Sequence, residues 1–129
     1  MRKIWKNIES VTKKTGTSYY IGYEVSNYGR VRSYKYKYGR GKRPLLQTPT
    51  IINGRLDQVG YPQYILSDIN GKRKNVRGHM LVMQTFVGLP DPGMVICHYD
   101  DIKTNNHIDN LRYDTQKSNL ADMKRNSKI

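Results

Sequence analysis

The stretch from Met94 to Asp122 constrains the fold of this chain more than any other part of the sequence. Its apolar beginning, Val95 to His98, predicts a β-strand that leads into a polar loop rich in Asp and Asn. A second short strand is predicted at Leu111 to Asp114, and the residues from Thr115 onwards are typical of a helix. The predicted order is therefore strand, loop, strand and helix, with a polar helix that faces back onto the strands.

Reactive side chains are concentrated in the same stretch, which holds two of the three histidines and the only cysteine. Acids also cluster between Asp91 and Asp122, although the whole chain carries a formal net charge of +13 and has a pI of about 9.9. Such an excess of cations implies a polyanionic partner, because Lys and Arg that neutralise phosphates release counterions. Charge alone fits a structural nucleic-acid binder as well as an enzyme. However, carboxylates repel nucleic acid, so their concentration in one stretch favours a site that holds a cation.

The residues from Cys97 to Asp122, C-H-Y-D-D-x-K-T-N-N-x-I-D-N-L-R-Y-D-T-x-x-S-N-x-A-D, resemble the HNH (ββα-metal, or His-Me finger) core of homing endonucleases encoded by phages and group I introns. The resemblance continues upstream in H-x-L-V-x-x-x-F-x-G, from His79 to Gly88. W-K-x-I, from Trp5, and Y-E-V-S-N-x-G-R-V-R-S, from Tyr23, are similar to a small modular domain often fused ahead of such cores. We therefore expect an α+β chain, with an N-terminal β-rich DNA-binding module at residues 1–60 and an HNH nuclease core at residues 61–129.

The resemblance implies roles for three side chains. His98 would be the general base, since imidazole titrates near neutral pH and its free base can take a proton from water. Asn110 would help to fix the loop and the orientation of the base, and Asn119 would bind the metal from the predicted helix. An amide oxygen suits one divalent ion, Mg²⁺ or Mn²⁺, that keeps several of its waters.

Cys97 stands where members of the family commonly carry a carboxylate, amide or imidazole ligand. A thiol suits Mg²⁺ poorly, and Cys97 and His98 would point to opposite faces of a regular strand. Three alternatives follow: Cys97 binds a softer ion as a thiolate, it is a small buried apolar residue while another acid completes the site, or the chain has lost turnover. The second alternative is favoured, with Asp100 and Asp122 as the candidate acids. Asp122 follows Asn119 by three residues and would share its helix face.

Two basic segments are candidates for contact with the DNA backbone. No acid occurs between Glu24 and Asp57, and Lys or Arg alternate with Tyr in residues 34–44, so an extended strand would present one cationic and one aromatic face. The second segment follows the predicted Asn70-Gly71 turn. Solvated basic loops are the alternative interpretation. The predicted DNA-binding side chains are Arg30, Arg32, Lys35, Lys37, Arg40, Lys42, Arg43, Lys72, Arg73 and Lys74.

Local patterns predict the remaining elements. Strands at 23–25 and 31–33 would flank the turn at 27–29, and Asn70-Gly71 would join strands at 64–69 and 74–77. Residues 12–18 are expected to form a loop, and residues 78–88 a short helix that ends at Gly88. We expect His79 to have a structural role at the start of that helix, and His107 to be exposed or in contact with DNA.

We interpret the chain as a metal-dependent endonuclease for double-stranded DNA that nicks or cuts both strands. The alternative is a non-catalytic DNA-binding protein on a degenerate HNH fold. No apolar run is long enough to span a membrane, and the N-terminus lacks a secretory signal. One cysteine and three scattered histidines do not make a structural zinc site of the common types. The expected protein is intracellular, in the cytoplasm of a bacterial host if a phage encodes it, and is a monomer or a homodimer.

Overall fold

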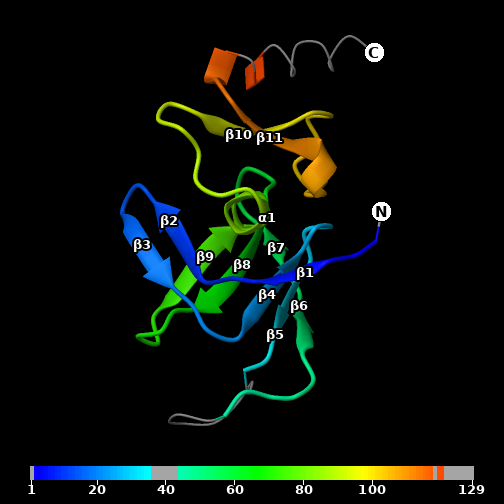
Figure 1. The fold of residues 1–129 in the computed structure, drawn as a ribbon. Coiled ribbons are helices and arrows are strands. Elements are labelled where there is room, and N and C mark those ends of the chain that lie inside the picture. Colours follow the sequence, from blue (N-terminus) through cyan, green and yellow to red (C-terminus); the bar gives the residue numbers. More distant parts are fainter. Residues whose placement is uncertain (1, 36–43, 118, 121–129) are drawn as a thin grey trace.

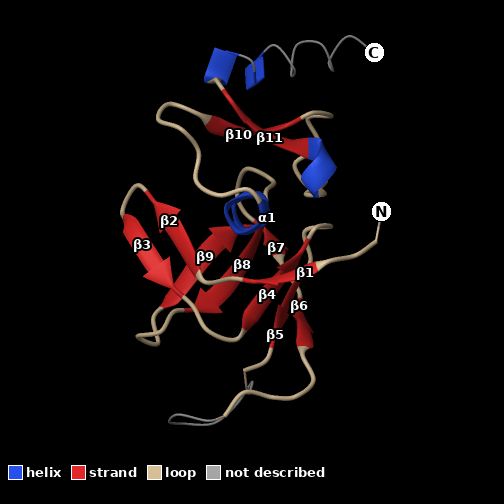
Figure 2. Ribbon diagram, viewed as in Figure 1, coloured by secondary structure: helices blue, strands red, loops and turns tan. Residues whose placement is uncertain are grey.

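The computed structural model describes residues 2–35, 44–117 and 119–120. These residues form an α+β fold built mainly of strands, with a helix packed among them, so the predicted fold class is confirmed (Figure 2). Within the described ranges, no helix is both long and apolar enough to cross a lipid bilayer. In chain order the elements are β1 (Trp5–Asn7), β2 (Ser10–Lys13), β3 (Gly16–Tyr19), β4 (Tyr23–Ser26), β5 (Val31–Ser33), β6 (Thr50–Ile52), β7 (Arg55–Leu56), β8 (Pro62–Ser67), β9 (Arg73–Arg77), α1 (Gly78–Phe86), β10 (Val95–His98), the 3-10 helix η1 (Ile108–Asn110) and β11 (Leu111–Asp114).

The strands before α1 pair largely as the turns predict. β4 and β5 are antiparallel about the turn at residues 26–29, where Gly29 has a φ of +84°, a conformation that glycine adopts without steric cost. β8 and β9 are antiparallel about the Asn70-Gly71 turn. Larger sheets extend these hairpins in the orders β1-β4-β5-β6 and β7-β8-β9. The expectation of a loop at residues 12–18 is wrong, because β2 and β3 form a hairpin in which Thr12 pairs with Thr17.

One hydrophobic core joins the two halves of the chain. Along β8, Tyr64 and Leu66 are buried while Ile65 is exposed, which is the period of a strand with one face on a core. α1 lies between the β4, β8 and β9 strands and the β10–β11 hairpin, and it contacts all of them (Figure 1). The buried residues of the core are Ile8, Val11, Tyr20, Tyr23, Val25, Val31, Tyr64, Leu66, Val76, Leu81, Val82, Met83 and Leu111.

The β10–β11 hairpin has the bounds that the sequence predicts. Its register pairs His98 with Leu111, so His98 is the last residue of its strand and stands directly before the polar loop. After β11, residues 116–117 and 119–120 are helical, and the Asn119 N–H donates to the Thr115 carbonyl at 3.1 Å. The predicted helix therefore begins where expected. It lies on the side of the hairpin away from α1 (Figure 1).

Candidate active site

His98 lies among polar and aromatic side chains at the end of β10. The residue is 6% exposed, so the ring is largely shielded from solvent. Its Nε2 lies 2.9 Å from Asn106 Oδ1, and the ring centroid is 5.4 Å from that of His79 and 6.2 Å from that of Tyr61. No described residue hydrogen-bonds to the other ring nitrogen, Nδ1. His98 therefore has one nitrogen held by the protein and one that is open to a ligand or a water.

His79, in the first turn of α1, packs between Tyr61 and His98. Its ring stacks on Tyr61 with centroids 5.0 Å apart and an interplanar angle of 30°. The side chain is 8% exposed, and its buried Nδ1 receives no hydrogen bond from any described residue. Burial lowers the pKa of His79 to about 3, and the nearby His98 ring and Arg77 guanidinium act in the same direction. At neutral pH the ring that packs beside His98 is thus uncharged.

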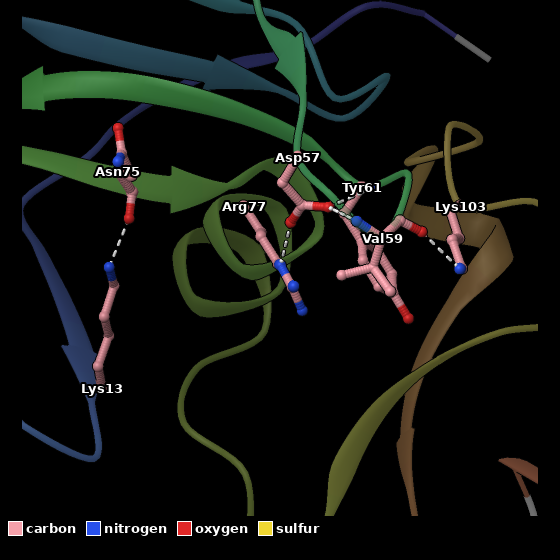
Figure 3. A network of polar contacts seen from close by, with 7 residues as sticks. All are labelled: Lys13, Asp57, Val59, Tyr61, Asn75, Arg77 and Lys103. Carbon is pink, nitrogen blue, oxygen red and sulfur yellow. Dashed lines mark hydrogen bonds and ion pairs between the residues drawn. The ribbon is translucent and has the colours of Figure 1, made fainter.

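The loop between β7 and β8 carries Tyr61, whose ring contacts both histidines. Figure 3 shows the polar contacts that hold this loop. Asp57 holds the loop: its Oδ1 accepts from the Val59 and Tyr61 N–H groups at 2.9 and 3.0 Å, and its Oδ2 lies 2.7 Å from Arg77 Nε. Burial alone would raise the pKa of Asp57, but these hydrogen bonds and Arg77 outweigh burial and lower it. Lys103 donates to the Val59 carbonyl at 2.6 Å. Arg77 and Lys103 lie 4.3 and 5.0 Å from the Tyr61 ring centroid, so two cations flank the aromatic ring that faces the histidines.

Asn110 fixes the loop between the two strands of the hairpin, while Asn106 is the amide that contacts the His98 ring. The Asn110 Nδ2 donates to Asp100 Oδ1 at 2.8 Å and to the Asn105 carbonyl at 2.9 Å. Asn105 Nδ2 in turn donates to Asp100 Oδ2 at 2.8 Å. Burial alone would raise the pKa of Asp100, but hydrogen bonds from Asn105, the Ile102 N–H and Asn110 lower it. Both Asp100 oxygens are thus engaged within the loop.

The predicted metal ligands do not form a protein-only site among the described residues. Within these ranges no three His, Cys, Asp or Glu side chains gather closely enough to hold a metal ion. Cys97 is fully buried, Asp100 serves the loop, and Asp122 lies outside the described residues. The half-buried Asn119 offers an amide oxygen. Hard ions such as Mg²⁺ are often held by one or two protein oxygens, with waters and substrate phosphates in the other positions, so this donor chemistry fits such an ion.

The predicted DNA-binding side chains differ in their surroundings. Arg32 is engaged within the protein, because its Nε lies 2.7 Å from Glu24 and its guanidinium 4.1 Å from the Trp5 ring centroid. Lys35 donates to the Ser67 carbonyl at 2.9 Å. The β8–β9 turn lies at the end of the molecule away from the β10–β11 hairpin (Figure 1). Of the predicted set, Arg30, Lys72 and Arg73 are exposed, Lys74 is half-buried, and Lys37, Arg40, Lys42 and Arg43 lie outside the described residues.

Sequence patterns assigned no role beside His98 to Tyr61 or to Lys103, and they placed Arg77 only in a basic segment and Asn106 only among the residues that could orient the loop. The Asn-Asn doublet at 105–106 was the one available signal, and its two members cannot be told apart without the path of the loop. His107 is less exposed than expected, and its contact with DNA stays a prediction. Its side chain is 20% exposed and packs edge-on against Tyr28, with ring centroids 4.4 Å apart.

Comparison with known proteins identifies the family that this hairpin resembles. Residues 76–121 match the family model of HNH endonucleases, which confirms the predicted resemblance. HNH nucleases generally use a divalent metal ion. The solved structure described as DNA binding and cleavage by the HNH homing endonuclease I-HmuI is similar, with a TM-score of 0.67 and 29% sequence identity. The match covers 98% of this chain and 60% of that one, so the chain spans well under the full length of the endonuclease. No curated protein matches the chain.

Proposed function

We propose that the chain is a metal-dependent endonuclease that hydrolyses phosphodiester bonds in double-stranded DNA. The observation that carries the proposal is the match of residues 76–121 to HNH endonucleases, because this segment holds His98 at the end of β10 and the loop that follows it. I-HmuI, which is similar over nearly the whole of this chain, binds and cleaves DNA. The net charge of +13 suits such a substrate.

In this proposal His98 is the general base. An imidazole nitrogen with no protein partner can accept the proton of an attacking water, and the His79 and Tyr61 rings shield the remaining surface of the base from bulk solvent. Asn110 keeps the loop closed through Asp100 and Asn105. Asn119 would hold Mg²⁺ or Mn²⁺, with Cys97, Asp100 and Asp122 as the other candidates. When bound, the ion would stabilise the charge that develops on the phosphoryl oxygens.

We also propose a division of labour along the chain, in which residues 1–60 serve as the DNA-binding module and residues 61–129 as the nuclease core. Arg30 in the first part is exposed and would contact phosphate. In the second part Lys72 and Arg73 are exposed, and Lys74 is half-buried beside them. The continuous core makes this a functional division within one folded body.

The proposal is tested by plasmid nicking with Mg²⁺, with Mn²⁺ and with EDTA. The wild-type protein should cleave with a divalent ion and not with EDTA. His98→Ala should lower the cleavage rate by about 100-fold or more, since general bases contribute that much, while DNA affinity measured in EDTA stays unchanged. His107→Ala is the matched control, because His107 lies in the same loop but is not in ring contact with His98. Wild-type cleavage by His98→Ala would exclude His98 as the base.

A non-catalytic DNA-binding protein is the second candidate, favoured by the buried thiol of Cys97 at a position where a ligand is expected. The same assay separates the two functions. Tight DNA binding by the wild-type protein, with no cleavage in any divalent ion, would support the binding protein and refute the nuclease.

A further inference from the structure

We propose that Asn106 is the positioning residue of His98, and that Gly29 and Gly78 form the seat that holds its carboxamide against His98 Nε2. The effect on cleavage rests on the proposed nuclease function. The arrangement itself is a property of the free protein, so it can be tested whether or not the protein cuts DNA.

The first step concerns the proton on the His98 ring. Asn106 is 4% exposed, and its Oδ1 lies 2.9 Å from His98 Nε2. Because an amide oxygen only accepts hydrogen bonds, this placement of Oδ1 assigns the proton to Nε2 and the lone pair to Nδ1. The other groups that face the ring are His79, Tyr61 and the Asp100 carboxyl, and none of them hydrogen-bonds to it. Among the described residues, Asn106 is therefore the one that selects the tautomer.

The second step concerns the space around the Asn106 side chain. A Cβ added at Gly29 would lie 2.7 Å from Asn106 Cβ, and one added at Gly78 would lie 2.9 Å from Asn106 Nδ2. Both distances are shorter than close-packed atoms allow, so a side chain at either position would displace Asn106. Gly29 also needs its positive φ, but Gly78 opens α1 without such a φ. Alanine is the better helix former, so backbone conformation does not explain the glycine at position 78, whereas its close contacts with Asn106 and, at 3.2 Å from an added Cβ, the Tyr64 ring do.

The third step concerns the turn that carries Gly29. The Ile108 N–H donates to the Asn27 carbonyl at 2.8 Å, and the Tyr64 hydroxyl donates to the Gly29 carbonyl at 3.2 Å. Asn27 is itself buried, and its side chain accepts from the Ile4 N–H at 2.8 Å. The turn between β4 and β5 is thus tied to the N-terminal strand, to β8 and to the loop before β11. It fixes the place of the loop that presents Asn106 to the base.

The tautomer is measured in the free, nitrogen-15-labelled protein, from the ring nitrogen chemical shifts at a pH above the titration range of imidazole. The chain has three histidines, so each ring can be assigned by substitution. Wild-type His98 should carry its proton on Nε2, and Asn106→Ala should give a mixture of tautomers. Asn106→Asp keeps an acceptor oxygen and should restore the wild-type tautomer.

Asn105→Ala is the matched control. It removes a neighbouring amide of the same loop that bonds to Asp100 and does not contact His98, so it should keep the wild-type tautomer. A wild-type His98 ring protonated on Nδ1 would overturn the proposal, as would an Asn106→Ala variant with the wild-type tautomer. Circular dichroism and thermal melting of each variant confirm that the protein measured is folded.

Cleavage kinetics then test the seat. Asn106→Ala should lower kcat by about 100-fold with KM for DNA unchanged, because a misplaced base reduces the chemical step and not binding. Gly78→Ala should lower kcat as well. The double variant should be no slower than Asn106→Ala alone, since the displaced carboxamide is already absent. If the losses of kcat in the two single variants add up in the double variant, Gly78 does not act through Asn106. A wild-type protein that never cleaves would refute the nuclease function, and the tautomer measurement would still decide the position of Asn106.

Discussion

Acid should destabilise this protein through His79, and the effect can be isolated by His79→Gln. His79 is 8% exposed, and burial lowers the pKa of its ring from 6.5 to about 3. The folded state therefore holds the ring neutral, while the unfolded chain protonates it at its ordinary pKa. Because the folded-state pKa is the lower one, the stability that depends on the neutral ring is fully present above pH 6.5 and is lost as the pH falls towards 3.

The magnitude follows from the size of the shift. Each pH unit between the two pKa values costs about 1.4 kcal/mol, so the loss is about 2 kcal/mol at pH 5 and about 4 kcal/mol at pH 3, where the folded-state ring is half protonated. The value at pH 5 is set almost entirely by the unfolded-state pKa, because a ring with a pKa of about 3 is still neutral there. That makes pH 5 the informative condition.

The assay is urea denaturation of wild-type protein and His79→Gln at pH 7.5 and at pH 5. Glutamine has no titratable group, and lost packing against Tyr61 affects the variant equally at both pH values. The protonation of carboxylates lowers stability in both proteins, so it cancels in the difference. The stability of wild type relative to His79→Gln should fall by about 2 kcal/mol between the two conditions. Parallel pH dependences would refute the reasoning and would mean that His79 is not held neutral by burial.

Three further predictions follow from the core, the turn and the charge. A fragment of residues 61–129 should be unfolded when measured by circular dichroism. Without the first 60 residues, the core around Leu66 and Leu81 lacks Val25 and Val31. A cooperative thermal melt of the fragment would contradict this. In urea denaturation, Gly29→Ala should lower the free energy of unfolding by about 1–3 kcal/mol more than Gly71→Ala. Both glycines have a positive φ, but of the two only Gly29 has atoms within 4 Å of an added Cβ. Equal losses would exclude the contact between position 29 and Asn106. The cations of the β8–β9 turn are Lys72, Arg73 and Lys74. Replacing all three with Gln should weaken DNA binding and reduce the slope of the logarithm of the DNA-binding constant against the logarithm of the salt concentration by about 2–3. An unchanged slope would exclude the turn from the DNA interface.

The sequence predicted the elements whose side chains alternate or whose turns have a strong local signal. Asn70-Gly71 and the turn at 27–29 each lie between runs of period two, and the β10–β11 hairpin has the predicted bounds. The β2–β3 hairpin was missed because its residues are mostly polar and Val11 alone reaches the core, so no alternation of apolar residues marks it. β2 and β3 form a sheet of their own, which is held against α1 by hydrogen bonds between Thr12 and Gln84, and local patterns do not encode such a contact.

The sequence predicted which types of residue form the site, but it did not predict which of their side chains are in contact. Strand, loop and motif place His98 correctly at the end of β10. The amide that contacts the His98 ring is determined by the path of the loop. In this loop Asp101 has a φ of +57°, and Asn106 packs against Gly29 and Gly78. Tyr61 reaches the ring from a loop that is distant in sequence, held by Asp57 and Arg77. Such long-range contacts are products of tertiary packing, and neither spacing nor composition reveals them.

The unsatisfied polar atoms around His98 distinguish this cluster from an ordinary core. A buried histidine with a purely structural role would be expected to use both nitrogens, because burying an unpaired polar group costs about 1–3 kcal/mol. Here His79 Nδ1 is buried and lacks a hydrogen bond from any described residue, and its ring lies 5.4 Å from that of His98. An apolar side chain at position 79 would avoid that cost. The surrounding chain instead supplies Asn106 for one nitrogen of His98 and leaves the other open. An available lone pair on that nitrogen is what the proposed role of His98 as general base requires.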